Sequence, residues 1–296
     1  MTALAAAVPL RRLRGAVRQN PLVSIAVTLL AGFALVLVLH PLLMPFDPMV
    51  ADRTGYVGGI SLRHPFGTDS TGLDVLSRLL HGTRYAVLLP LAAMVLALVV
   101  GVPLGLVAGL RGGLFDRFLR RLDQAVGMVP GLALALALVA GMGHAYVNVV
   151  ITIGLLDALV FARAMRAEAW ALRERGFVEA AVAAGNPGWR VVAVHLLPNT
   201  VPWLLALVPR RLAVALGTLS AMGYLGLAGA PTSTEWGAMV RRSAEDLLGG
   251  HWWAALFPGL AIALLGFAWR LLGTGLADLR RARMAGAQER ILGVEA

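Results

Sequence analysis

The sequence predicts an all-α integral membrane protein with six transmembrane helices and one helical loop on the cytoplasmic side. Of the 296 residues, 58% are hydrophobic and only 14% are charged, whereas soluble domains carry roughly 25% charged residues. The mean hydropathy is +0.77. A third observation is that every basic residue is an arginine, and that the arginines gather at the ends of long apolar runs. This pattern is typical of a chain that crosses a bilayer several times.

Six apolar runs are long enough to cross the hydrocarbon core, which requires about 20 helical residues. The predicted spans are residues 22–43, 86–110, 124–141, 145–162, 201–227 and 253–273. The first run follows four arginines, as the apolar part of a secretory signal would. It is too long for a signal peptide, however, and no small-residue cleavage site follows it, so we expect a retained membrane anchor.

Arginine counts on the two sides of the spans predict the orientation. With the N-terminus in the cytoplasm, the inner segments contain 18 arginines and the outer segments contain six, while Arg210 and Arg211 lie inside the fifth span. Cytoplasmic segments of membrane proteins are rich in arginine and lysine. We therefore expect a multi-pass protein of the bacterial inner membrane, with both termini in the cytoplasm.

The segments between the spans follow from these boundaries. We expect a cytoplasmic N-terminal segment (1–21), an external segment (44–82) after the first span (22–43), a five-helix core (83–279) and a frayed cytoplasmic tail (280–296). The external segment is rich in Pro, Gly, Asp and Arg, and so long a connection is rarely structureless. It is therefore expected to be a small ordered cap.

The largest cytoplasmic loop, residues 163–200, contains the stretch EAAVAAGNPGWRVVAVHLLPN. A short helix is predicted at 177–184, because good helix formers are followed by Gly185, Asn186 and Pro187. Glu179 suits the positive end of that helix, and the alanines give the helix a thin surface. One interpretation is a helix that lies on the membrane interface. The other is a helix that enters a groove of a partner protein.

Several kinds of chemistry are disfavoured by composition. A P-loop needs a lysine to reach the nucleotide phosphates, and the chain has no lysine. There is no cysteine, no serine-elbow motif and no H-E-x-x-H motif, and the six histidines are not placed at ligand spacing. We therefore predict no catalytic residue, no metal site and no cofactor in this chain. Nucleic-acid binding is disfavoured because the arginines flank apolar runs.

The loop resembles a segment that is found in a known protein family. The letters E-A-A, then Gly185 and then H-L-L-P at this spacing are similar to the EAA loop of ABC importer permeases. The stretch HPFGTDSTGLDVLSR (64–78) resembles the outer signature of the dipeptide/oligopeptide/nickel branch of that family. GYLGLAGAPTSTEWGAMV (223–240) and the closing helix (257–278) resemble it too. Val182 and Leu73 stand where the family commonly has basic residues.

The resemblance implies the type I permease fold of ABC importers, in which one subunit forms half of a translocation pathway. It implies as partners a second homologous permease subunit, two ATPase subunits that bind ATP and Mg, an external substrate-binding protein and membrane lipids. Coupling to the ATPases would involve a set of loop residues: Glu179, Ala180, Ala181, Gly185, Trp189 and Pro198. The external signature comprises His64, Gly67, Thr68, Asp69, Gly72 and Asp74.

The substrate remains open at this stage, because di- and oligopeptides, glutathione-like molecules and nickel complexes are all carried within the branch. Charged residues deep inside the spans are Asp157, Arg210 and Arg211. Since a charge facing lipid costs several kcal/mol, at least one of the arginines is expected to line the pathway or to pair with Asp157. Snorkelling of both to lipid phosphates is the alternative. Competing functions are a membrane-embedded enzyme and a self-sufficient channel or secondary transporter.

Overall fold

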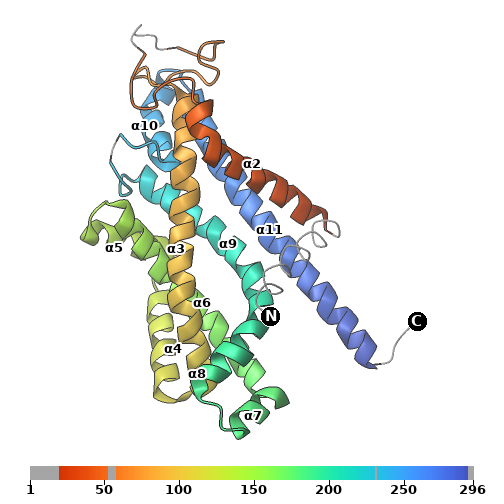
Figure 1. Ribbon diagram of the computed structural model, residues 1–296. Helices are drawn as coiled ribbons and strands as arrows, with labels where there is room; N and C mark the ends of the chain where they lie inside the picture. Colours follow the sequence, from red (N-terminus) through yellow and green to blue (C-terminus); the bar gives the residue numbers. More distant parts are fainter. Residues whose placement is uncertain (1–19, 53–57, 231, 293–296) are drawn as a thin grey trace.

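The computed structural model describes residues 20–52, 58–230 and 232–292, and all regular elements within these ranges are helical. Within these ranges, five helical stretches are long and apolar enough to cross a membrane, and a bent pair raises the number to six if it counts as one span. The five are α2 (Pro21–Leu43), α3 (Val75–Arg111), α6 (Tyr146–Arg173), the continuous stretch Gly188–Tyr224 and the first part of α11 (Trp253–Leu292). Figure 1 shows them as an elongated bundle.

The third predicted span, 124–141, is not a straight helix. Its residues are divided between α4 (Gly113–Gly127) and α5 (Gly131–Met142), whose axes meet at 92°. Pro130 lies at the break and has no N–H to continue the helix. The prediction of one regular crossing was therefore wrong, because apolar composition does not report a bend.

Helix α3 runs through the middle of the bundle and packs against α6 along most of its length (Figure 1). Three glycines at four-residue spacing, Gly101, Gly105 and Gly109, lie on the face of α3 that touches α6. A Cβ atom on Gly105 would lie 2.3 Å from the carbonyl oxygen of Ala162. The two backbones can approach this closely only because the glycines have no side chain.

Helix α2 lies against α11, with the beginning of α2 beside the inner half of α11 (Figure 1). Asn20 caps α2 by accepting a hydrogen bond from the Leu22 amide at 2.9 Å, and its side-chain amide lies 3.5 Å from the Gly275 carbonyl oxygen. The two helices are antiparallel, so the start of α2 and the end of α11 lie on the same side. Residues 1–19, and with them most of the predicted N-terminal segment, lie outside the described residues.

Several predicted boundaries were too narrow, because apolar runs underestimate helices that continue beyond the bilayer. Helix α3 begins at Val75, so residues 75–82 of the segment predicted to be external (44–82) are helical. The cytoplasmic loop predicted at 163–200 is helical except for a few residues around α7 (Gly176–Ala183). The tail predicted to fray from residue 280 is part of α11 as far as Leu292. Its Ala, Arg, Leu, Gln and Glu residues are good helix formers.

We name the two ends of the bundle, outer and inner, after the orientation that the sequence predicts. The outer end is formed by residues 44–52 and 58–74, the loop after α9 (Leu197–Tyr224) and α10 (Trp236–Leu248), as Figure 1 shows. Trp236 is 1% exposed and its indole N–H donates to the carbonyl oxygen of Leu79 at 3.0 Å. This contact ties α10 to the first turns of α3. The opposite, inner end carries α7 and the short α8 (Gly188–Arg190).

Candidate functional site

The loop predicted to be cytoplasmic contains the predicted short helix, α7, displaced by one residue from the predicted range. Val178 and Ala181 are buried, at 1% and 7% exposure, and they pack in a hydrophobic cluster with Val191 and Leu196. The coupling candidates of this helix lie on different faces. Glu179 and Ala180 are exposed, whereas Ala181 belongs to the face that packs on the bundle. One face of α7 therefore holds it to the bundle, and the other is open.

The open face is apolar in part. The exposed fractions of the large apolar side chains in this region are 40% for Phe177 and 53% for Val182 on α7, and 69% for Trp189 on α8. Phe177 and Val182 lie outside the candidate membrane spans, and Trp189 lies at the start of one. An exposed apolar surface of this kind marks a protein or membrane contact. The geometry suits a surface that another molecule covers.

Gly185 follows α7 with φ = +76°. The turn is closed by the Asn186 backbone and side-chain N–H groups, which both donate to the carbonyl oxygen of Ala181, at 3.3 Å and 2.9 Å. A left-handed glycine just after a helix, with its amide groups turned back on the last carbonyls, is the usual helix stop. The predicted stop signal at Gly185 and Asn186 is confirmed.

The stretch after the turn is helical, which was not predicted. A π-helical turn, η1 (Val191–Leu196), leads directly into α9. Pro198 lies exposed in the first turn of α9, where its missing N–H removes one helical bond. A π turn before a proline accommodates the carbonyl that the ring would otherwise meet. The loop is therefore joined to α9 without a flexible break.

The charged residues inside the spans form one ion pair. Arg211 on α9 donates to Oδ1 of Asp157 on α6, and the Asp157 side chain is 4% exposed. The pair predicted from the sequence is thus present. The second carboxylate oxygen, Oδ2, and the Nε group of Arg211 are buried without a hydrogen-bond partner. The pair is therefore only half satisfied.

Arg210 behaves differently from its neighbour. It is exposed, and its stem lies against α11, where a Cβ on Gly273 would be 2.6 Å from Cγ of Arg210. Adjacent residues on a helix point in directions about 100° apart, so only Arg211 reaches Asp157. The two arginines therefore have different environments.

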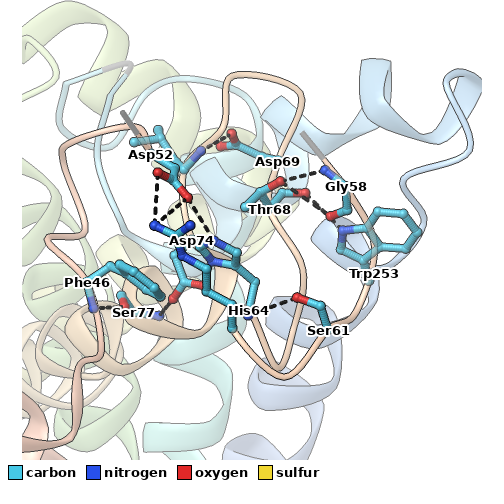
Figure 2. A network of polar contacts seen from close by, with 12 residues as sticks. Phe46, Asp52, Gly58, Ser61, His64, Thr68, Asp69, Asp74, Ser77 and Trp253 are labelled. Atoms are coloured by element: carbon cyan, nitrogen blue, oxygen red, sulfur yellow. Dashed lines mark hydrogen bonds and ion pairs between the residues drawn. The ribbon is translucent and has the colours of Figure 1, made fainter. Parts of the chain in front are cut away.

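The residues of the external signature form a network at the outer end of the bundle, as Figure 2 shows. His64 is 1% exposed, with Nδ1 2.8 Å from Oδ1 of Asp74 and Nε2 3.2 Å from Oδ2 of Asp52. The Phe46 ring stacks on the imidazole at 4.5 Å between centroids. Asp74 also caps α3, because its Oδ2 accepts the Ser77 amide at 2.7 Å. His64 therefore fixes the cap onto the start of a membrane span.

The remaining signature residues shape the turns of this cap. Oδ1 of Asp69 accepts the backbone amides of Thr71 and Leu73 at 3.0 Å and 2.9 Å. Gly72 has φ = +79°. The carbonyl oxygen of Thr68 accepts the indole N–H of Trp253 at 2.9 Å (Figure 2), and Gly67 lies under the same indole. The signature thus joins the cap to α11 as well as to α3.

Two buried polar groups were not singled out from the sequence. Arg78 is 2% exposed and donates to the carbonyl oxygens of Pro48 and Ser233 at 2.9 Å and 3.1 Å. Glu235 is fully buried, and its two carboxylate oxygens accept the amides of Gly237 and Ala238 at 2.9 Å and 2.8 Å. The only available signal for Glu235 was its position before the Trp-Gly pair that opens α10.

Burial raises the pKa of Glu235 to about 7, against the opposing effect of the hydrogen bonds from Gly237 and Ala238. A carboxyl group removed from water resists ionisation, whereas hydrogen bonds to the anion favour it. The raised pKa shows that burial is the larger effect at this position.

The described residues contain no group of three or more His, Cys, Asp or Glu side chains arranged to hold a metal ion. The arrangement instead offers an exposed apolar surface around α7, a polar pair between two helices and a folded cap at the opposite end. Residues 101–281 match the family described as "Binding-protein-dependent transport system inner membrane component".

Similar proteins cover nearly the whole chain. It is 30% identical over 271 residues to the "Probable D,D-dipeptide transport system permease protein DdpC" of Escherichia coli K12, covering 92% of this chain and 91% of that protein. It is 36% identical over 261 residues to the glutathione transport system permease protein GsiD of Salmonella paratyphi A, covering 86% of each. The dipeptide transport system permease protein DppC of Alkalihalophilus pseudofirmus is 30% identical over 267 residues, covering 90% of this chain and 88% of that protein.

The family match extends over more than half of the chain, and the cap that precedes it aligns with full-length relatives. The chain is a multi-pass membrane protein and belongs to the family of binding-protein-dependent transport system inner membrane components.

Proposed function

We propose that this chain is a permease subunit of an ATP-driven importer that carries di- or oligopeptides across the bacterial inner membrane. The observation that carries the proposal is the similarity over most of the chain to permeases named for dipeptides and for glutathione, which is itself a small peptide. The chain would form half of the translocation pathway, and a second, homologous permease subunit would form the other half.

ATP and Mg are assigned to two partner ATPase subunits, because this chain has no lysine from which a P-loop could be built. An external binding protein would deliver the substrate on the side of the cap. Both termini would lie in the cytoplasm, as the arginine distribution predicts. The chain itself would have no catalytic role.

Coupling would run through α7. The thin face around Glu179 and Ala180 would enter a cleft of an ATPase, and Phe177, Val182 and Trp189 would widen the contact. The anchored face, with Val178 and Ala181, packs on η1, which continues into α9. A displacement of α7 would therefore move the inner half of α9, and alternating access would follow from this movement.

The pathway would pass close to the Asp157–Arg211 pair. The half-satisfied pair joins α6 to α9, and movement of α9 would change its geometry. A guanidinium at this depth would attract a peptide carboxylate, and the neighbouring carboxylate would attract an ammonium group. Uptake by the Arg211→Gln variant is expected to fall at least tenfold, and uptake by Arg210→Gln is expected to fall less. Equal, wild-type uptake by both variants would remove the arginines from the pathway.

The function is tested by reconstitution into liposomes. The purified chain alone is expected to hydrolyse no ATP, whereas the complex with its ATPases, second permease subunit and binding protein should accumulate a radiolabelled dipeptide only when ATP is present. Accumulation by the single chain without ATP would instead indicate a channel or secondary transporter. Saturable hydrolysis by the single chain would contradict the assignment of ATP to the partners.

The role of α7 is tested by a bulky residue on its thin face. Ala180→Trp should abolish binding-protein-stimulated ATP hydrolysis and uptake, because the side chain would prevent α7 from entering a cleft. Ala244→Trp is the matched control, since Ala244 is an exposed alanine on the outer helix α10. Normal coupling in Ala180→Trp would show that α7 does not dock in this way.

A further inference from the structure

A cluster of polar and aromatic side chains lies at the outer ends of α3 and α6, beside the loop that leads to α10. The rings of Tyr85 and Tyr146 are stacked, with centroids 4.9 Å apart. The Tyr146 hydroxyl is hydrogen-bonded to the Ser233 hydroxyl. Arg84 donates from Nη2 to the Tyr85 hydroxyl at 2.7 Å, and its guanidinium carbon lies 4.7 Å from the centroid of that ring.

The guanidinium of Arg84 is incompletely satisfied. Its Nε group is buried without a hydrogen-bond partner, and within the described part of the chain no carboxylate lies at ion-pair distance from it. Glu235, an acidic residue in the adjoining loop, has both oxygens engaged at the start of α10. A partly buried cation without a counter-ion is costly unless an anion joins it.

Two other arginines at this end, both among the described residues, are engaged differently. Arg78, two turns earlier on α3, donates to backbone carbonyl oxygens of Pro48 and Ser233. Arg63 is paired with Asp52 at 3.3 Å. Arg84 thus combines three features: a free donor, aromatic walls on one side and hydroxyl groups from three different elements nearby.

We propose that Arg84, Tyr85, Tyr146 and Ser233 form a subsite that binds a carboxylate group of the transported peptide as it enters from the outside. The inference rests on the proposed function and names a contact for its substrate. A guanidinium presents parallel donors that match the two oxygens of a carboxylate, and hydroxyl groups can supply further hydrogen bonds. The Asp157–Arg211 pair lies about 16 Å further inward along α6, at 1.5 Å per residue.

The first test is chemical labelling of the assembled complex in liposomes. The chain contains no cysteine, so Leu88→Cys places a single thiol in it, at a side chain that is 51% exposed and one turn inward from Arg84. A thiosulfonate reagent that carries a carboxylate should react about tenfold faster than its trimethylammonium counterpart. Adding Arg84→Gln should remove this preference. Dialanine should slow the reaction, and dialanine amide should not.

Each alternative has its own result. Failure of both reagents to react with the Leu88→Cys variant would place this face of α3 in lipid and overturn the proposal. Equal rates for both reagents in the presence of Arg84 would also overturn it. The alternative ligand of the Arg84 guanidinium is the phosphate group of a lipid. In that case the preference would change between phosphatidylcholine vesicles and vesicles that also contain phosphatidylglycerol, and dialanine would give no protection.

The second test is uptake of dialanine with saturating binding protein. Arg84→Gln should raise the apparent KM about tenfold, and Arg84→Lys should raise it less because the positive charge is kept. Arg63→Gln should leave the apparent KM unchanged, because Arg63 is an outer cation with its side chain 56% exposed and its own partner. If the wild-type complex imports no peptide, the proposed function fails, whatever the labelling shows. If it imports dialanine and Arg84→Gln imports it equally well, only the subsite fails.

Discussion

At the scale of single residues, Gly185 shows how one backbone conformation can matter without any side-chain contact. Its φ is +76°, and a Cβ added to it would meet nothing within 4 Å. The space around it would accept any small residue. Only the left-handed conformation, which costs an L-residue about 1–2 kcal/mol, requires glycine at this position.

Gly185→Val is therefore expected to reorient the turn after α7 and to reduce coupled ATP hydrolysis and uptake, without loss of protein from the membrane. Gly185→Asn should retain most activity, because asparagine tolerates this conformation. Gly250→Val is the matched control. Gly250 has φ = +85° and equally open surroundings, but it lies at the outer end. Normal coupling in Gly185→Val, measured at equal levels of assembled complex, would contradict this prediction.

Glu235 leads to a prediction about pH. Burial raises its pKa in the folded protein from 4.5 to about 7, so between these values the folded state holds a proton that the unfolded state has lost. The stability that this proton provides is complete below about pH 4.5 and is lost as the pH rises to about 7, on the order of 3 kcal/mol in all. Thermal unfolding of the purified protein should show this decline.

Other groups also titrate over the same range, so the informative quantity is the difference between two proteins. Glu235→Gln should unfold at a lower temperature throughout, since each carboxylate oxygen accepts a different backbone amide and the NH2 group that replaces one of these oxygens cannot accept a hydrogen bond. Its unfolding temperature should nevertheless depend less on pH between 5 and 7 than that of the wild type. Parallel pH profiles for the two proteins would show that Glu235 is not the group that titrates.

Sequence reasoning identified some of these residues and missed others for a physical reason. Gly185 was identified because a helix stop is a local property, readable from neighbouring residues. The Asp157–Arg211 pair was anticipated because few charges lie inside the spans and each needs a partner. His64 was noticed, but its two carboxylate partners and its place in the cap were not predicted, because they depend on how distant turns meet in space.

At the scale of elements, the contact of α3 with α6 depends on small residues. The added-Cβ distances at Gly101, Gly105 and Gly109 are 2.3, 2.3 and 2.6 Å to backbone oxygen atoms of α6. Backbone atoms cannot move aside as a flexible side chain can. Close packing of this type replaces the hydrophobic effect as the force that joins helices in a bilayer.

Gly105→Ala should therefore force α3 and α6 apart and destabilise the fold by about 1–3 kcal/mol. Gly259→Ala on α11 is the control, because nothing lies within 4 Å of its added Cβ and alanine favours the helix. The measurement is the unfolding temperature of each purified variant in detergent. An equal effect of the two substitutions would show that the α3–α6 contact tolerates a methyl group.

The same scale explains which elements the sequence could predict. Apolar runs identify a helix that is buried in lipid, so the positions of α2, α3, α6, α9 and α11 were predicted well. They give no information about charged or polar turns that extend a helix into water, and the ends of α3, α6 and α11 were accordingly misplaced. The bend between α4 and α5 lies at Pro130, which has no N–H to continue the helix, and apolar composition does not report such a break.

At the scale of the whole molecule, the orientation in the membrane decides which side the cap and α7 each face. The antiparallel contact of α2 with α11 places the start of α2 beside Gly275, so the first described helix begins on the side where the last one ends. The cap and α7 lie at opposite ends of the bundle (Figure 1). If α7 meets ATPases in the cytoplasm, the cap must face outward, where a binding protein would arrive.

Cysteine labelling in cells with a permeabilised outer membrane tests this orientation. We expect a membrane-impermeant maleimide to label Leu62→Cys, whose parent side chain in the cap is fully exposed, and to label Val182→Cys on α7 only after the inner membrane is lysed. The cysteine-free parent chain provides the background. The physical reason is that the segments on the α7 side contain most of the arginines, and segments rich in arginine stay in the cytoplasm. The reverse labelling pattern would invert the topology and remove α7 from any cytoplasmic ATPase. Labelling of both positions from outside would contradict a bundle that crosses the membrane between them.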